Sequence, residues 1–245
     1  MIRGITTLWK KESRDFFSSP LVYILAGIFC ALMGWLFYNY LIASKDITNK
    51  TLSMSILIPT YGNMNFIFLF LAPLLTMKLF SEEKKLHTLD LLLQSNLNHF
   101  QIIAGKFLAG LTVMLFMLSL TLIFPIILSF SGYNDWGTVA SSYAGIVFSI
   151  MCYLSVGIFA SSLTDNQIVA ALSGFGILMF LMLLVLTSNA THNVLLQQIF
   201  SYLSTPYHFE SFVRGAFRSY NLIYFVSFIG FFFYLTHKSL DSRNW

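Results

Sequence analysis

The sequence predicts an all-α integral membrane protein with six transmembrane helices. Hydrophobic residues make up 57% of the 245 residues and charged residues only 10%, which is unlike a soluble globular domain. Six apolar runs without Asp, Glu, Lys or Arg each come close to the length of about 20 residues that spans a membrane as a helix. Basic residues also gather in alternate connections between the runs, as the positive-inside rule requires.

Residues 1–19 precede the first run and are expected to form a helix that lies in the membrane interface. Ile5, Trp9 and Phe16 recur at helical spacing with Phe17 beside them, and the basic residues lie largely elsewhere. The alternative is a disordered basic tail, which would have less reason to carry these aromatic side chains. The stretch lacks the short apolar core of a secretory signal.

The six apolar runs are the expected membrane spans: Pro20–Ala43, Ile56–Met77, Phe107–Ser131, Thr138–Leu163, Ile168–Ser188 and Asn221–Thr236. Pro73 and Pro125 lie inside runs and are expected to kink their helices, which is tolerated where neighbouring helices satisfy the freed carbonyls. Residues 189–220 contain two short amphipathic stretches. We expect them to form a pair of short external helices that dip into the outer leaflet before the last span.

The distribution of basic residues predicts the orientation of the chain. With the N-terminus inside, only four of the 14 Lys and Arg residues lie in outer segments. The other ten lie in cytoplasmic segments: Arg3, Lys10, Lys11, Arg14, Lys78, Lys84, Lys85, Lys106, Lys238 and Arg243. Both termini are therefore expected in the cytoplasm.

The densest cluster of charge lies between the second and third runs, at Phe80–Asn98. Ser81 suits an N-cap, and Glu82 and Glu83 would then lie in the first turn, where the helix dipole favours anions. An apolar stripe follows at spacings of three and four, at Leu86, Leu89, Leu93 and Leu97. We predict a cytoplasmic helix over Glu82–Asn98 that does not cross the membrane. An ordinary charged loop with one helical turn is the alternative.

This stretch resembles the segment after the second transmembrane helix of ABC-2-type permeases, which are membrane subunits of ABC transporters. The matching positions are Lys78, Phe80, Glu82–Lys85, Thr88–Leu93 and Gly105–Lys106. His87 departs from the family pattern, which often has Gly there. The resemblance covers nearly the whole chain and implies a single ABC-2-type transmembrane domain over residues 1–245.

In that family the charged helix touches the ATP-hydrolysing partner. The resemblance therefore implies a coupling role for Glu82, Glu83, Lys84, Lys85, Thr88 and Asp90. It implies three kinds of partner, namely an ABC ATPase subunit, a second permease copy or a related permease, and membrane lipid, but no nucleic acid. ATP and Mg would be bound by the partner, so no cofactor is expected in this chain.

A narrower resemblance rests on two segments near the C-terminus. His208–Gly215 with Tyr224–Phe228, and the ending Ser239–Trp245, are similar to the gliding-motility-associated permease subunits of Bacteroidetes and to related copper-processing permeases. This resemblance implies a location in the bacterial inner membrane and a role in export, gliding or secretion. The residues themselves show no such role.

Several kinds of chemistry are absent from the sequence. No Gly-x-x-x-x-Gly-Lys-(Ser/Thr) loop occurs, so the chain is not expected to be an enzyme and no catalytic residue is predicted. The five His residues are scattered without His-x-x-x-His spacing, so we expect surface or interfacial histidines and no metal site. The runs contain no Asp, Glu, Lys or Arg, which disfavours an ion-coupled transporter. A self-contained secondary transporter or channel, and a membrane assembly protein without transport, remain the alternatives.

Overall fold

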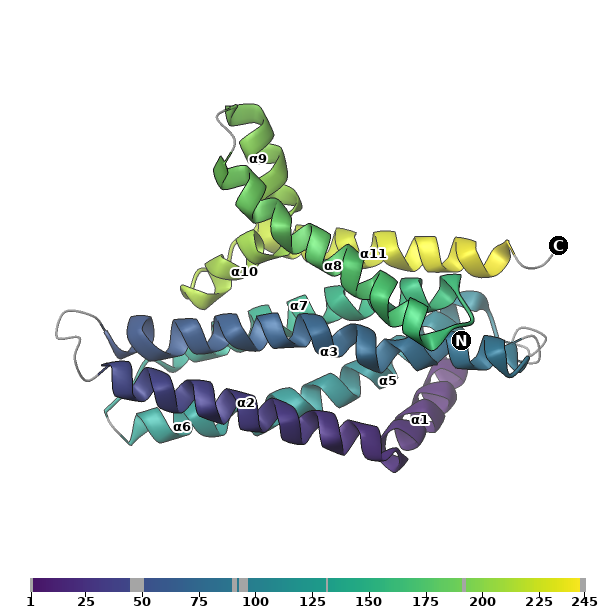
Figure 1. The fold of residues 1–245 in the computed structure, drawn as a ribbon, viewed down its shortest axis with the longest axis horizontal. Coiled ribbons are helices and arrows are strands. Elements are labelled where there is room, and N and C mark those ends of the chain that lie inside the picture. The colour runs from purple at the N-terminus through teal and green to yellow at the C-terminus, as the bar shows by residue number, and fades with distance from the viewer. Residues whose placement is uncertain are drawn as a thin grey trace.

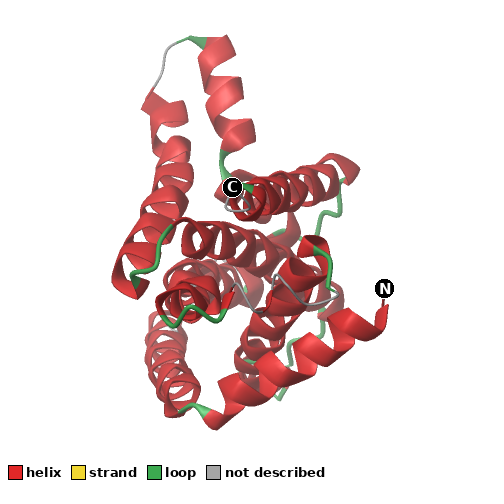
Figure 2. Ribbon diagram, turned by 90° about the vertical axis from the view of Figure 1, so that its right-hand side faces the viewer, coloured by secondary structure: helices red, strands yellow, loops and turns green. Residues whose placement is uncertain are grey.

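The computed structural model describes residues 2–44, 51–89, 92, 97–130, 132–190 and 193–242. Within these ranges the chain is almost entirely helical and contains no strand (Figure 2). Most of the long helices run side by side (Figure 1). The elements are α1 (Ile2–Ser18), α2 (Pro20–Ser44), the π-helical turn η1 (Ser53–Leu57), α3 (Ile58–Lys85), α5 (His99–Leu120), α6 (Ile123–Ser129), α7 (Trp136–Leu163), α8 (Gln167–Ala190), α9 (Val194–Leu203), α10 (Thr205–Val213) and α11 (Ser219–Asp241).

Six helical segments within these ranges are long and apolar enough to cross a membrane. They correspond one for one to the predicted runs, so the all-α, six-span prediction is confirmed. Three segments extend beyond the predicted boundaries into charged residues. The second reaches Lys85 instead of ending at Met77, the third begins at His99 instead of Phe107, and the sixth reaches Asp241 instead of ending at Thr236. At these three places the helix continues through charged residues that the prediction had excluded from the spans.

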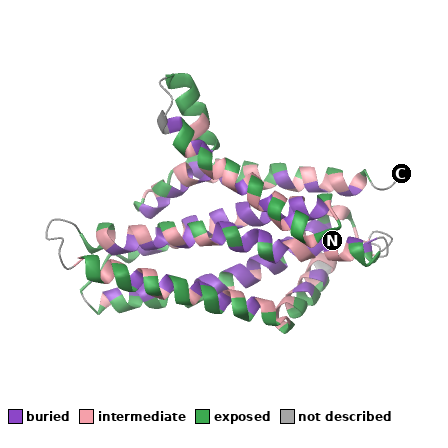
Figure 3. Ribbon diagram, viewed as in Figure 1, coloured by how far each residue is buried: buried purple, intermediate pink, exposed green. Residues whose placement is uncertain are grey.

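Helices α3 and α7 form the centre of the bundle and are its most buried spans (Figure 3). Small residues allow this close packing. A Cβ atom on Gly157 of α7 would overlap the Thr76 hydroxyl oxygen of α3. A Cβ atom on Gly174 of α8 would lie 3.3 Å from the Cβ of Ala160. Glycine is therefore required at position 157, where the two central helices touch.

The third span is broken where Pro125 was expected to kink it. Helix α5 ends at Leu120 and α6 begins at Ile123. Proline has no N–H group to donate to the carbonyl four residues earlier, which belongs to Thr121. The Thr121 hydroxyl donates to the Leu118 carbonyl at 2.6 Å and so gives a partner to a carbonyl group in the last turn of α5. In contrast, α3 continues through Pro73 without a break.

The connection between the fifth and sixth spans forms the predicted pair of short helices, α9 and α10. Helix α10 packs against α7, where the Ser141 hydroxyl donates to the Phe212 carbonyl at 2.8 Å. Helix α9 has no buried residue and, with the end of α8, stands away from the rest of the bundle (Figure 1). The location of this pair in the outer leaflet stays a prediction.

Helix α1 confirms the helix that was predicted within residues 1–19, while its position in a membrane interface stays a prediction. It packs against α5 and lies at the same end of the bundle as the last turn of α11 (Figure 1). The end of α3 and the start of α5 lie there too. We call this the charged end of the bundle, after the residues Glu12, Glu83, Lys84, Lys106 and Asp241.

Candidate functional site

The charged end is organised around the last two turns of α3. The helix continues past Ser81 and ends at Lys85, so the predicted start of a separate helix at Glu82, with Ser81 as its N-cap, is wrong. Residues 90, 91 and 93–96 of the predicted Glu82–Asn98 helix lie outside the described residues. The Ser81 hydroxyl donates to the backbone carbonyl one turn back instead of capping a helix start. Glu82 and Glu83 thus lie near the end of a helix and not in a first turn. Lys84 and Lys85 occupy its last turn, where the helix dipole favours cations.

A Schellman turn ends α3. The Thr88 N–H donates to the Glu83 carbonyl at 2.9 Å, and the His87 N–H donates to the Lys84 carbonyl at 3.1 Å. His87 has a φ angle of 54°, in the left-handed region that glycine usually occupies. The chain therefore reverses direction directly after the helix. We call residues Lys85 to Thr88 the α3 turn.

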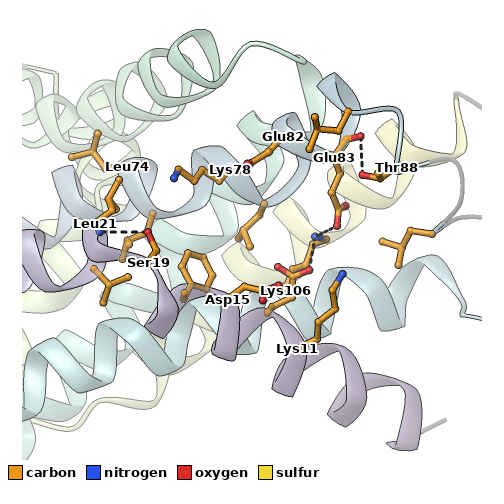
Figure 4. Close-up of a pocket in the computed structure, with 17 residues that line it drawn as sticks. Lys11, Asp15, Ser19, Leu21, Leu74, Lys78, Glu82, Glu83, Thr88 and Lys106 are labelled. Carbon is orange, nitrogen blue, oxygen red and sulfur yellow. Dashed lines mark hydrogen bonds and ion pairs between the residues drawn. The ribbon is translucent and has the colours of Figure 1, made fainter.

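Lys106 of α5 joins α1 and α3 through a buried ion network. Its Nζ lies 2.8 Å from Oε1 of Glu83 and 3.0 Å from Oε1 of Glu12 (Figure 4). The side chains are 1% exposed for Lys106, 12% for Glu12 and 18% for Glu83. The Phe80 ring centroid lies 5.2 Å from the ammonium group and adds a cation–π contact. Because an unpaired buried charge is costly, this network keeps the three helices in register with one another.

The last turns of α3 are also bonded to α7. The Ser161 hydroxyl oxygen accepts two hydrogen bonds from successive backbone N–H groups of α3, at 3.0 and 3.1 Å. The Lys84 ammonium donates to the Ser162 carbonyl. The same carbonyl accepts a hydrogen bond from the Ser239 hydroxyl of α11 at 3.1 Å. The end of α3 is therefore bonded directly to α5 and α7, it is joined to α1 through Lys106, and it shares a carbonyl of α7 with α11.

The Gly105–Lys106 pair explains how α1 is placed on α5. A Cβ atom on the glycine would lie 3.0 Å from the side chain of Leu8, so the absence of a side chain lets α1 approach. Glu12 lies one turn after Leu8 and reaches the lysine. The Trp9 Nε1 group donates to the Thr112 hydroxyl of α5 at 2.9 Å. Part of the aromatic face that was expected to rest on the membrane therefore contacts α5.

The α3 turn is the exposed part of this region. Leu86 is 63% exposed, whereas Leu89 directly after the turn is 1% exposed and belongs to the core of the chain. Leu86 and Leu89 of the predicted apolar stripe therefore do not share one exposed face, because Leu89 packs in the core of the chain. The other exposed residues of the turn are Lys85, His87 and Thr88.

The structure separates the six residues predicted to couple the chain to an ATPase. Glu83 and Lys84 have partners inside the chain, whereas Lys85 and Thr88 lie in the exposed turn. Glu82 is partly buried and lines the cavity beside the ion network. Asp90 lies outside the described residues. Sequence reasoning did not predict Glu12 and Lys106 as site residues. The available signal was a lone Lys near the start of a strongly apolar helix, which requires a carboxylate partner when buried.

A cavity of about 720 Å³ opens beside the ion network, between α1, α2, α3 and the α3 turn (Figure 4). The polar part of its lining includes Lys11, Asp15, Lys78 and Glu82. The apolar part includes Phe16, Leu21, Leu74, Leu79 and Leu86. This mixed lining at the end of an apolar bundle suits an amphiphilic molecule, with its polar group held by a few charged side chains.

His208 lies in a different environment from the one predicted. It was expected to be a surface or interfacial histidine, but it is buried between α10 and α11. Its Nδ1 lies 2.8 Å from Oδ1 of Asn221 and its Nε2 lies 3.0 Å from the Tyr202 carbonyl oxygen. Its ring stacks on Tyr224 with the centroids 3.9 Å apart. Both ring nitrogens have partners, so this histidine is part of the packing of the short helices.

Replacement of His87 by glycine is expected to stabilise the protein. A left-handed conformation costs a non-glycine residue about 1–2 kcal/mol, and glycine removes this cost. Glycine also gives the unfolded chain more conformational freedom, which lowers the gain in stability by about 0.4–1 kcal/mol. The net increase in the free energy of unfolding should be about 0.5–1 kcal/mol. Thermal unfolding in detergent would measure it, with His87→Val as the opposite case because a β-branched residue fits this φ angle poorly. A less stable glycine variant would contradict the described turn.

Comparison with known families identifies the chain. The model of the family described as ABC-2 family transporter protein matches residues 6–232. No curated protein matches the chain. The match includes most of α1, the end of α3, the start of α5 and five complete spans, and therefore nearly all of the bundle described above. The chain belongs to the ABC-2 family of transporter proteins and is a permease subunit of an ABC transporter.

Proposed function

We propose that this chain is one half of the membrane pathway of an ABC exporter and that a separate ABC ATPase subunit drives it through the α3 turn. The proposal rests on how the α3 turn is connected to the rest of the chain. Its residues are exposed, and they continue directly from the end of α3. The Glu12–Lys106–Glu83 network and Ser161 bind the end of α3 to α1, α5 and α7. A displacement of the turn would therefore move several helices together.

The proposed mechanism assigns a different task to each subunit. The partner would bind ATP and Mg and would change shape during hydrolysis, and the α3 turn would carry this change into the bundle as a two-state rearrangement. In this mechanism Lys85, Leu86 and Thr88 touch the partner. Glu83 and Lys84 position the turn from inside the chain. No residue of this chain acts as a catalyst.

We further propose that two permease subunits, either two copies or this chain and a relative, assemble with two ATPase subunits. Six spans make half of a pathway in this family. Exposed apolar side chains on the fifth span and α9 suit both lipid and a second permease, and they include Ile168, Leu172, Phe180, Leu183, Leu195 and Ile199. Membrane lipid is the amphiphile that best suits the cavity beside the ion network.

We propose a location in the bacterial inner membrane with the charged end in the cytoplasm, which the distribution of basic residues supports. Single cysteines at Asn134 and Asp165 test the orientation, because both positions are exposed and lie in connections at opposite ends of α7. The two native cysteines, Cys30 and Cys152, would be replaced by alanine. An impermeant thiol reagent added to whole cells should label Asn134→Cys alone. Labelling of Asp165→Cys before the membrane is opened would contradict the proposed orientation and indicate the opposite one.

A role in gliding or secretion is the narrower part of the proposal. It rests on the resemblance of residues 208–215 and 239–245 to gliding-motility-associated permeases. Deletion of the gene in a gliding host, with complementation by the intact chain, tests it through colony spreading. Normal spreading of the deletion strain would restrict the proposal to export.

The proposal is tested by extraction of the tagged full-length chain from its native membranes. A polypeptide with a Gly-x-x-x-x-Gly-Lys-(Ser/Thr) loop should copurify, and the complex should hydrolyse ATP. The isolated permease should show no turnover. Substrate movement by the isolated chain in vesicles without ATP would favour a secondary transporter instead. Within the described spans, however, Asp, Glu, Lys and Arg lie only in α3, α5 and α11 at the charged end, which supports the ATP-driven alternative.

A further inference from the structure

We infer that His99, His237 and Asp241 form a binding site for one divalent first-row transition ion, for which Zn²⁺ is the best match. The three residues meet at the charged end from two helices. His99 is the first residue of α5, while His237 and Asp241 lie one turn apart in the last turns of α11. Nothing in the proposed function depends on this cluster.

The side chains converge at distances that a metal ion can bridge. His99 Nδ1 lies 2.8 Å from Oδ1 of Asp241, and His237 Nδ1 lies 3.2 Å from Oδ2 of the same carboxylate. All three ligand atoms lie within 4.8 Å of one another. Ligands of tetrahedral zinc, each at about 2.0–2.1 Å from the ion, are separated by about 3.3 Å. Only the two imidazole nitrogens must move closer, which small rotations of the partly exposed rings permit.

The backbone around the cluster is held in place by contacts that do not involve the three side chains. The backbone N–H of Asn98, directly before His99, donates to the Gln101 side-chain oxygen at 3.0 Å and so fixes the start of α5. One turn before His237, the Phe233 ring packs edge-on against Phe107 of α5 with centroids 5.0 Å apart. The same ring lies edge-on to Phe100, directly after His99, with centroids 6.4 Å apart. The two helices are therefore already in contact beside the ligands, so the ion would not have to assemble the site.

The chemistry of the donors indicates the kind of ion. Two imidazoles and one carboxylate suit zinc and neighbouring transition ions, whereas magnesium and calcium prefer oxygen ligands alone. Asp241 lies at the negative end of the α11 dipole, where a cation beside it is stabilising. Its described ion-pair partners are only the two imidazoles. The side chains are 20%, 42% and 39% exposed for His99, His237 and Asp241, which leaves a fourth position open to water.

The ion would connect the end of α11 to the first residue of α5. The sequence alone could not reveal this site, because the two histidines belong to helices that are far apart in the chain. The expectation of no metal site rested on the spacing of histidines within one helix, and that spacing does not test a site built by two helices.

The test uses the full-length chain, extracted with any bound partner, purified through a tag without histidine and freed of metal by a chelator. Zn²⁺ binding would be measured by titration, and Co²⁺ would serve as a spectroscopic probe because its visible absorption reports the coordination geometry. We expect one ion per chain with micromolar or tighter affinity. His237→Gln and Asp241→Asn should each weaken binding more than tenfold, since even indirect partners of a metal ligand contribute about 10–100-fold.

His87→Asn is the matched control, because His87 is exposed at the same end of the chain and Asn tolerates its left-handed conformation. The control should bind Zn²⁺ like the unchanged chain. Asp241→Asn keeps the shape of the side chain, so it remains informative if His237→Gln folds poorly. Zn²⁺ should also raise the melting temperature of the unchanged chain and of the control only. Two results would contradict the metal site: equal Zn²⁺ binding by the unchanged chain, the control and both site variants, or no binding by the unchanged chain at micromolar Zn²⁺. Asp241 would then only hydrogen-bond to the two histidines.

Discussion

Replacement of Lys106 by methionine is expected to destabilise the chain by about 3–5 kcal/mol, which is the usual effect of the removal of one partner from a buried ion pair. The substitution keeps the length of the side chain but leaves the Glu12 and Glu83 carboxylates without their shared cation. A typical domain has a free energy of unfolding of only about 5–15 kcal/mol, so the amount of folded protein should fall sharply. Size-exclusion chromatography of the extracted chain after a heating step would measure this loss.

A neutral network is the decisive control for this prediction. Glu12→Gln and Glu83→Gln, combined with Lys106→Met, remove all three charges and keep the side-chain shapes. This triple variant should recover much of the lost stability, because replacement of a whole buried network by neutral groups is far less costly than removal of one member. A Lys106→Met chain as stable as the original would show that the network does not hold α1, α3 and α5 together. Glu83→Lys should resemble Lys106→Met, since it places two cations face to face.

Replacement of Leu86 by aspartate is expected to weaken ATPase association by more than tenfold, which corresponds to about 1.4 kcal/mol. Leu86 is the apolar side chain of the α3 turn and is proposed to become buried against the partner. An aspartate there would lose the apolar contact and would be buried without a partner charge. The amount of folded permease should stay nearly normal, because Leu86 is 63% exposed in the chain alone.

Two matched variants separate contact from folding in this second prediction. Leu86→Met keeps the apolar character and should retain ATPase association. Leu89→Asp should instead lower the amount of folded protein, because Leu89 is buried in the core of the chain. Copurification of the ATPase, normalised to the amount of permease, distinguishes the two effects. Normal association of Leu86→Asp would exclude the α3 turn as the contact.

The spans could be predicted because they depend on local composition. A bilayer requires long apolar helices with satisfied backbone groups, and the runs without charge show this directly. Pro125 likewise marked the break between α5 and α6 through its missing N–H group. The pair α9 and α10 followed from two short stretches, each too short to span. These features need no knowledge of which helices touch.

The end of α3 could not be predicted in the same way, because the partners of its charged residues lie on other helices. From the sequence, Glu83 was assigned to the first turn of a polar helix. In the structure Glu83 pairs with Lys106 of α5, and Lys84 donates to a carbonyl of α7. With these partners, α3 continues through charged residues at which the sequence predicted its end. The glycine common in the family at the position of His87 was the available signal, since glycine marks the end of a helix.

The most direct test of the central claim is a cross-link from the α3 turn to the ATPase in native membranes. With Cys30 and Cys152 replaced by alanine, a single cysteine would be introduced by His87→Cys and coupled to a short photoreactive group. The product should contain the polypeptide that carries the phosphate-binding loop, and its yield should change when ATP is added. Asn134→Cys, at the opposite end of the bundle, should give no such product. An ATPase that is cross-linked equally well from both positions, or from Asn134→Cys alone, would contradict the proposal that the α3 turn is the point of contact.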